Sequence, residues 1–193
     1  MFNQAGQLTA IVRAIIVPLL LVWLGPGCRS ERLRETQSAT TTPAAGTSKI
    51  KPVQLIDSTG LRKLVQERNG RILFLNIWAT WCAPCVEEFT DIVKLSRMEA
   101  ENAVDVVAIS ADYTDEIESK IMPFLKRHDV PFQVYVAKFD HQEDFINAIN
   151  SQWNGALPAT LIYNQHGVQR YFKVGQSTFE EFKKEIDKLK MEP

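Results

Sequence analysis

The chain has 193 residues, of which 45% are hydrophobic and 23% charged, a balance typical of a globular protein and not of a disordered one. Its formal net charge is −1, and lysine and arginine are spread along the chain, so the composition argues against a nucleic-acid-binding protein. Its three cysteines are too few to build a disulfide-rich scaffold, so each one needs its own explanation.

Residues 1–28 are predicted to be a signal peptide or a membrane anchor. An apolar run from Ala14 to Leu24 follows Arg13; it is short for a membrane-spanning helix but suits the core of a signal peptide. Residues 25–27 break the run just before Cys28, which resembles a bacterial lipoprotein signal with a lipidated cysteine. Lipidation of Cys28, ordinary cleavage and an uncleaved anchor all stay open, and each places the following domain outside the cytoplasm, where disulfide chemistry is abundant.

Residues 29–49 are polar and small, rich in threonine, serine and alanine, and show no apolar period. This composition predicts a flexible linker, with an r.m.s. span of roughly 25 Å. A lipid at Cys28 would therefore hold the domain predicted over residues 50–193 near a membrane surface and leave it free to turn.

From Val53 onward, strand patterns alternate with helix patterns. We predict strands over Val53–Ile56, Arg71–Trp78, Val104–Ser110 and Phe132–Ala137, and a hairpin of Ala159–Tyr163 with Val168–Val174. We predict helices over 61–68 (capped by Asp57 or Ser58), 82–98, 114–128 (kinked or restarted at Pro123), 140–152 and 178–190. This order implies a largely parallel sheet with helices on both faces, to which the hairpin adds an antiparallel edge.

The most informative motif, Trp81-Cys82-Ala83-Pro84-Cys85, stands where an apolar strand pattern gives way to an amphipathic helix pattern. A thiol at a helix start faces unpaired backbone N–H groups and the positive end of the helix dipole. We therefore expect the pKa of Cys82 to fall from about 8.5 toward or below ~7. Cys85, one turn on, lies on the same helix face, so the pair can open and close a disulfide.

The cysteine pair has two alternative interpretations. The pair could be half of a zinc site, but the chain has no second Cys-x-x-Cys and no His-x-x-x-His to complete the ligands, so no metal is expected. The pair could also be two inert buried thiols, against which the flanking Trp81 and Pro84 argue.

With this motif the chain resembles thioredoxin-like proteins and, among them, the TlpA/ResA-like thiol–disulfide oxidoreductases, over roughly residues 50–190. Residues 155–163 look like the family's cis-proline loop and the strand after it. The helix and strand between Thr114 and Ala137 exceed the minimal thioredoxin unit, as a TlpA/ResA-type insertion does. The resemblance implies an α/β thioredoxin-like fold, with a central mixed sheet, helices on both faces and that insertion.

The resemblance also implies roles for the motif residues. Cys82 would attack a substrate disulfide, and Cys85 would resolve the mixed disulfide. Ala83 and Pro84 would tune the redox potential. The redox-active Cys82–Cys85 disulfide would be the reacting group, so no cofactor is expected.

Three further residues are predicted to meet the substrate. The resemblance implies that Pro158 is cis and that the backbone of Leu157 faces Cys82, where it can pair with an extended substrate segment. Trp81 is expected to form an apolar lip on which a partner docks.

Glu88 is the predicted proton carrier for the buried thiol. Thioredoxin itself uses an aspartate on the preceding strand, but the matching residue here is Asn76, which cannot titrate; TlpA/ResA-like proteins carry a glutamate where this chain has Glu88. Helix geometry places Glu88 at the border of the inward stripe and Glu87 in solvent. Partial burial should raise the pKa of Glu88 and suit it to proton transfer. A solvated helix carboxylate is the alternative.

We expect an extracytoplasmic, membrane-tethered thiol–disulfide oxidoreductase that reduces disulfides of exported proteins, by analogy in cytochrome c maturation. Its partners would be those proteins, a membrane or extracytoplasmic electron donor and the membrane through the N-terminus; it would bind no nucleic acid and act as a monomer.

Two alternative functions stay open. A thiol peroxidase shares the scaffold, but Ala79 and Leu75 stand where that family places threonine and proline. A tethered binding module with a permanent disulfide is the non-enzymatic alternative.

Overall fold

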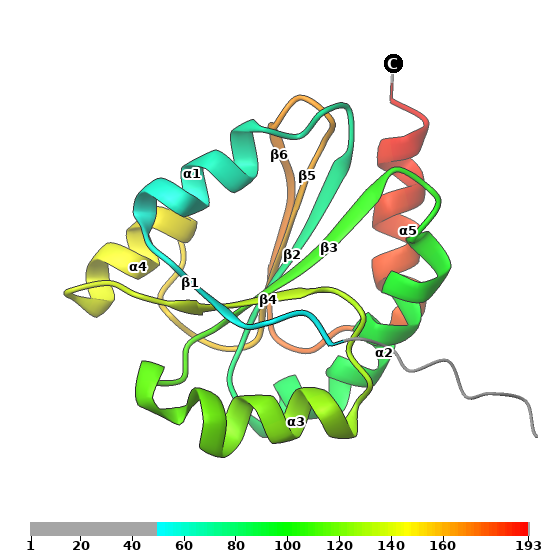
Figure 1. Cartoon of the computed structure of the whole chain (residues 1–193). Helices are drawn as coiled ribbons and strands as arrows, with labels where there is room; N and C mark the ends of the chain where they lie inside the picture. Colours follow the sequence, from blue (N-terminus) through cyan, green and yellow to red (C-terminus); the bar gives the residue numbers. More distant parts are fainter. Residues whose placement is uncertain (1–49, 193) are drawn as a thin grey trace, which may run out of the picture. The chain divides into compact units, whose positions relative to one another are not determined.

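The computed structural model describes residues 50–192 (Figure 1). The predicted signal or anchor (1–28), its Cys28 and the predicted linker (29–49) lie outside these residues. The elements are β1 (Gln54–Ile56), α1 (Ser58–Gln66), β2 (Ile72–Trp78), α2 (Ala83–Glu99), β3 (Val104–Ser110), α3 (Met122–Arg127), β4 (Gln133–Ala137), α4 (Gln142–Ile149), β5 (Ala159–Tyr163), β6 (Gln169–Val174) and α5 (Phe179–Lys190). Between residues 50 and 192, no helix is both long and apolar enough to span a bilayer.

The strands form one mixed sheet in the order β1-β4-β3-β2-β5-β6. Strands β1, β4, β3 and β2 run parallel, whereas β5 lies antiparallel to both β2 and β6. The predicted mixed sheet with an antiparallel hairpin at one side is therefore confirmed. The parallel centre brings the carboxyl ends of β2 and β3 to the same edge, where the redox motif begins.

The sheet separates two hydrophobic cores because side chains of a strand alternate between its faces. Phe74 and Trp78 of β2 belong to the core shared with α2, α3 and α5, whereas Leu75 and Ile77 belong to the core shared with α1 and α4. Figure 1 shows α1 and α4 on one side of the sheet and α2 and α5 on the other. All seven residues of β2 are buried, which explains why its sequence is apolar on both faces except at Asn76.

The predicted helix over 114–128 is a composite. It begins as a 3-10 turn (Thr114–Glu116), continues as a π-helical turn (Ile117–Ile121) and ends as α3, with Pro123 in the first turn of α3. Pro123 has no backbone N–H, so one helical hydrogen bond is lost where the π-helical turn passes into α3. Phe124 of α3 packs on Trp78, with ring centroids 4.7 Å apart, so this segment covers the same face as α2.

Two predicted helices have other bounds in the structure, α1 beginning and ending earlier than predicted and α4 being shorter, because side chains bind the backbone at their ends. Helix α1 begins after Asp57, whose carboxylate accepts the Gly60 N–H at 2.7 Å, and it ends at Gln66. Arg68, predicted to be helical, instead donates to Asp105 of β3 at 2.8 Å. Helix α4 ends at Ile149 because Asn150 is extended and its side chain accepts the Gln152 N–H at 2.8 Å.

Candidate active site

The cysteine motif stands at the start of α2, as predicted. Cys82 is the N-cap residue of this helix, in extended conformation, and its Sγ accepts the Cys85 N–H at 3.3 Å. Pro84 stands in the first turn, where its lack of an N–H costs little. The sulfur of Cys82 therefore lies where unpaired N–H groups and the helix dipole favour a negative charge.

Cys82 and Cys85 form a disulfide with an S–S distance of 2.01 Å, so the implied redox pair is confirmed. Cys82 is 6% exposed and Cys85 only 1%. The sulfur that a partner can reach is therefore that of Cys82, which agrees with its predicted role as the attacking residue.

The loop before β5 adopts the implied conformation. The Leu157–Pro158 bond is cis, Pro158 is buried and Leu157 is half-buried. The carbonyl of Pro158 accepts the Gly175 N–H at 2.8 Å, which fixes this loop to the turn after β6. Trp81 is 64% exposed, as its predicted place at the rim of the site requires.

A groove of about 750 Å³ opens beside the motif. Trp81 and Leu157, both predicted to meet the substrate, line it together. Four other aromatic residues complete its apolar surface: Tyr113, Phe139, Phe145 and Trp153. A groove of this size next to the reachable sulfur can receive part of a macromolecular partner.

Glu88 is more deeply buried than predicted. It is 1% exposed, whereas Glu87 is exposed, so the inward position of Glu88 is confirmed. Its two oxygens accept one hydrogen bond each at 2.9 Å, from the side-chain amide of Asn76 and from the backbone N–H of Ser177. Burial raises the pKa of Glu88 to about 7, against the two hydrogen bonds, which lower it. This carboxyl group can take up and release a proton near neutral pH.

Asn76 explains how an acid is held at this position. The same amide nitrogen that contacts Glu88 also donates to the Thr160 hydroxyl at 3.1 Å, so β2, β5 and α2 meet at one polar cluster. Asn76 occupies the strand position where the resemblance places the thioredoxin aspartate. In this chain the carboxyl group with the raised pKa stands on helix α2, and the strand residue donates a hydrogen bond to it.

Two residues just after β3 were missed by the sequence analysis. Asp112 is buried and accepts hydrogen bonds from Thr80, which precedes the motif, and Tyr113 is 77% exposed on the groove. Their position was a usable signal, because loops that follow adjacent parallel strands meet at the same edge of a sheet.

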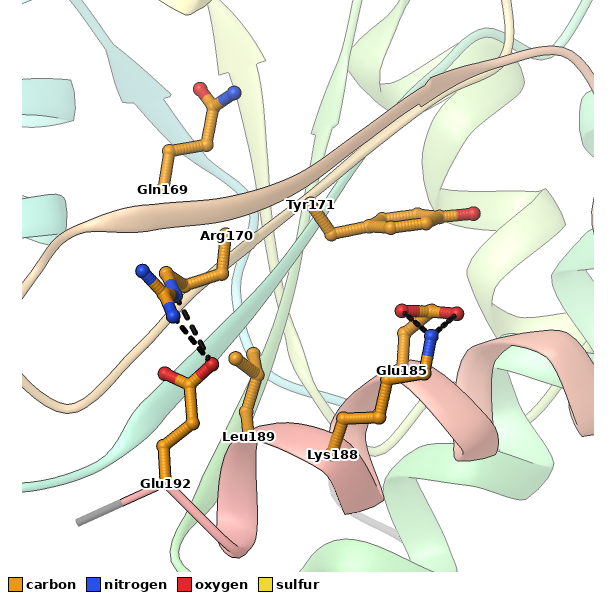
Figure 2. Close-up of a pocket in the computed structure, with 7 residues that line it drawn as sticks. All are labelled: Gln169, Arg170, Tyr171, Glu185, Lys188, Leu189 and Glu192. Carbon is orange, nitrogen blue, oxygen red and sulfur yellow. Dashed lines mark hydrogen bonds and ion pairs between the residues drawn. The ribbon is translucent and has the colours of Figure 1, made fainter.

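A second hollow, of about 240 Å³, lies between β6 and α5 (Figure 2). Its charged side chains pair with one another: Arg170 donates to Glu192 at 2.7 Å and Lys188 to Glu185 at 2.6 Å. It contains no residue of the motif. Across residues 50–192, no group of three or more His, Cys, Asp and Glu residues is placed to hold a metal ion.

Comparisons with known proteins agree with this geometry. The model of the Redoxin family matches residues 44–188. The thioredoxin-like protein YneN of Bacillus subtilis is 28% identical over 130 residues, 67% of this chain and 71% of that protein. The thiol-disulfide oxidoreductase ResA of Geobacillus thermodenitrificans is 26% identical over 184 residues, 95% of this chain and 98% of ResA.

Solved structures share the fold. A thiol:disulfide interchange protein of the thioredoxin family from Chlorobium tepidum superposes with a TM-score of 0.55 at 21% identity. The superposition covers 63% of this chain and 81% of that one. The α/β thioredoxin-like fold implied by the motif is therefore confirmed.

Proposed function

This chain belongs to the Redoxin family, and from that premise we propose that it is an extracytoplasmic thiol–disulfide oxidoreductase that reduces disulfides of exported proteins. The observation that carries the proposal is the placement of Cys82, whose sulfur caps α2 and is bonded to that of Cys85. A thiolate at this position is stabilised by the helix N-terminus, and the thiolate is the reactive form in disulfide exchange.

The first step forms a mixed disulfide. In the reduced protein, the Cys82 thiolate attacks one sulfur of the substrate disulfide, and the substrate S–S bond breaks. The other substrate sulfur leaves as a thiolate and takes a proton from solvent. Trp81, the neighbour of Cys82, and Leu157 line the groove, so they can contact the substrate segment next to the attacked sulfur.

The second step releases the substrate. The Cys85 thiol loses its proton, and the resulting thiolate attacks the Cys82 sulfur, so that the second substrate sulfur leaves and is protonated. The substrate gains two electrons, and the cysteine pair loses two electrons and ends as the disulfide. Glu88 is the proposed acceptor of the Cys85 proton, since it is buried on the same helix and its pKa is about 7.

The location and partners complete the proposal. The apolar run that ends before Cys28 supports tethering of the domain to a membrane, by lipid or by an uncleaved anchor, outside the cytoplasm. The chain would act as a monomer on exported proteins, apocytochrome c among them by resemblance. A membrane-bound or extracytoplasmic electron donor would return two electrons to the Cys82–Cys85 disulfide after each turnover.

The decisive experiment traps partners in the cell. Cys85→Ala leaves Cys82 able to attack but removes the resolving thiol, so mixed disulfides should accumulate and can be identified by mass spectrometry. The matched control, Cys82→Ala with Cys85→Ala, should trap nothing. A Cys85→Ala variant that traps no exported protein contradicts the proposal. Peroxide consumption by the purified reduced chain would instead favour a thiol peroxidase, and a disulfide that dithiothreitol cannot reduce would favour a binding module.

A further inference from the structure

A carboxylate that the proposed chemistry does not use lies beneath the turn that carries the motif. Asp112, two residues after the end of β3, is only 3% exposed. Its carboxylate accepts the Thr80 N–H at 2.9 Å, the Thr80 hydroxyl at 2.6 Å and the Ser110 hydroxyl at 2.5 Å. The backbone N–H of Asp112 donates to the Ser110 hydroxyl at 2.9 Å, so the acid is itself held on the end of β3.

These bonds fix the turn between β2 and α2. The Cys82 N–H donates to the Ala79 carbonyl at 3.2 Å, which closes the turn. Thr80, inside the turn, is tied through Asp112 to the neighbouring strand. Hydrogen bonds to a charged acceptor are shorter and stronger than those between neutral groups, so the bonds to Asp112 restrict the motion of Thr80.

The residue that follows Thr80 is the exposed Trp81. Trp81 and Asp112 line the same groove. An exposed tryptophan on an untied turn would sample many orientations, and ordering it on binding would cost free energy. A turn tied at Thr80 gives Trp81 its orientation before a partner arrives.

We propose that Asp112 is a positioning residue for partner docking: through Thr80 it holds Trp81 along the groove, where an apolar segment beside the disulfide of a protein substrate binds. The inference rests on the proposed function, because it takes the occupant of the groove to be the protein that Cys82 attacks. Since Asp112 acts through Trp81 and not on the sulfur atoms, it governs reaction with a protein disulfide and not with a small one.

The test compares two disulfides on the full chain. Single-turnover rates of the reduced protein are measured by acid quench and thiol alkylation, with insulin as the protein disulfide and hydroxyethyl disulfide as the small one. For Asp112→Asn, the half-saturating insulin concentration should rise about fivefold or more, the effect of losing one important interface contact. The limiting rate with insulin and the rate constant with hydroxyethyl disulfide should stay within about twofold of wild type.

Controls separate docking from folding. Asp115→Asn removes an exposed acid three residues away and should change neither reaction. Thr80→Val removes the hydroxyl donor but keeps the backbone N–H, so it should shift the insulin reaction in the same direction by less, and it serves if Asp112→Asn fails to fold. Because Asp112 acts through Trp81, Asp112→Asn should add little to the loss caused by Trp81→Ala.

The outcomes are distinguishable. Equal losses with both disulfides, or full additivity of Asp112→Asn with Trp81→Ala, overturn the inference. So does an unchanged half-saturating insulin concentration in both Asp112→Asn and Thr80→Val. A wild-type chain that reduces hydroxyethyl disulfide but not insulin contradicts the proposed function itself.

Discussion

Helix α2 carries a buried glutamate near each end, and the two are held in different ways. Glu88, near the start, and Glu99, the last residue, are both 1% exposed. Glu88 accepts hydrogen bonds from neutral donors, the Asn76 amide and the Ser177 N–H, whereas Glu99 accepts one from the Lys190 ammonium at 2.5 Å. A buried acid with neutral partners is poised to exchange a proton, and one with a cation partner fastens two helices together.

The comparison assigns chemistry to the start of α2 and stability to its end. Near the start, the cysteines and Glu88 lie on one side of the helix. At the end, Glu99 connects α2 to α5 through Lys190. The two regions should therefore respond differently to substitution, and four predictions follow from that difference.

The largest effect is expected at the first cysteine. Cys82→Ser should lower the rate of disulfide exchange with insulin by at least about a thousandfold, because a hydroxyl at this position is not ionised and cannot replace the thiolate. The rate is measured by quenching the reaction at set times and alkylating the insulin thiols. Cys85→Ser, in contrast, should still form the mixed disulfide and fail to release the substrate. A Cys82→Ser variant with normal activity would show that the start of α2 takes no part in the reaction.

A large effect on stability is expected from the titration of Glu88. Its pKa is raised from 4.5 to about 7, so the folded chain holds a proton that the unfolded chain has lost. The stabilisation from this group is full below the unfolded pKa and is lost as the pH rises through the folded pKa. Between about pH 5 and about pH 8, the free energy of unfolding of wild type should fall by up to about 3 kcal/mol relative to Glu88→Gln. Urea titrations of both oxidised proteins across this range measure the difference; parallel pH profiles would contradict it.

Glu88→Gln should also slow the release of substrate by about a hundredfold above pH 7, because the amide cannot accept the Cys85 proton. In wild type, the decay of the mixed disulfide should quicken as the pH rises through about 7, where Glu88 becomes ionised. That step should vanish from the pH profile of the variant. Glu87→Gln, which changes the exposed neighbour, is the matched control and should leave the profile intact; the role of Glu88 is refuted if both variants behave alike.

The smallest effect is expected at the other end of the helix. Lys190→Ala leaves Glu99 buried without its cation, and should lower the free energy of unfolding by about 1–2 kcal/mol, less than for a fully buried pair because Lys190 is 29% exposed. Exchange with insulin should not change. Lys188→Ala, which removes an exposed pair with Glu185, should cost less than about 0.5 kcal/mol. A loss of disulfide exchange in Lys190→Ala would show that the end of α2 also contributes to the reaction.

How much of this was predictable depends on the sequence distance between the residues involved. Strand β3 was predicted at its observed bounds, Val104–Ser110, because an apolar run bounded by polar residues is a local signal. The cysteine pair was likewise predicted, since the two residues are one helical turn apart. The inward position of Glu88 followed from the same periodicity, although its full burial did not.

Contacts between distant segments were not predictable in the same way. The Ser177 N–H that holds Glu88 comes from 89 residues farther along the chain, and the Asp112 carboxylate that holds Thr80 from 32 residues farther. The early end of α1 has the same cause, because Arg68 pairs with Asp105 across the sheet. Such contacts depend on which loops the finished sheet brings together, and no periodic pattern within one segment contains that information.

The two edge strands of the sheet are poorly suited to pairing with a foreign strand. Strand β1 has only three residues, and β6 carries the charged side chains of Arg170 and Lys173. Short or charged edges discourage the addition of foreign strands, which is the first step of aggregation. Neither flank of the sheet therefore invites a foreign strand, which limits self-association of the chain through its sheet edges.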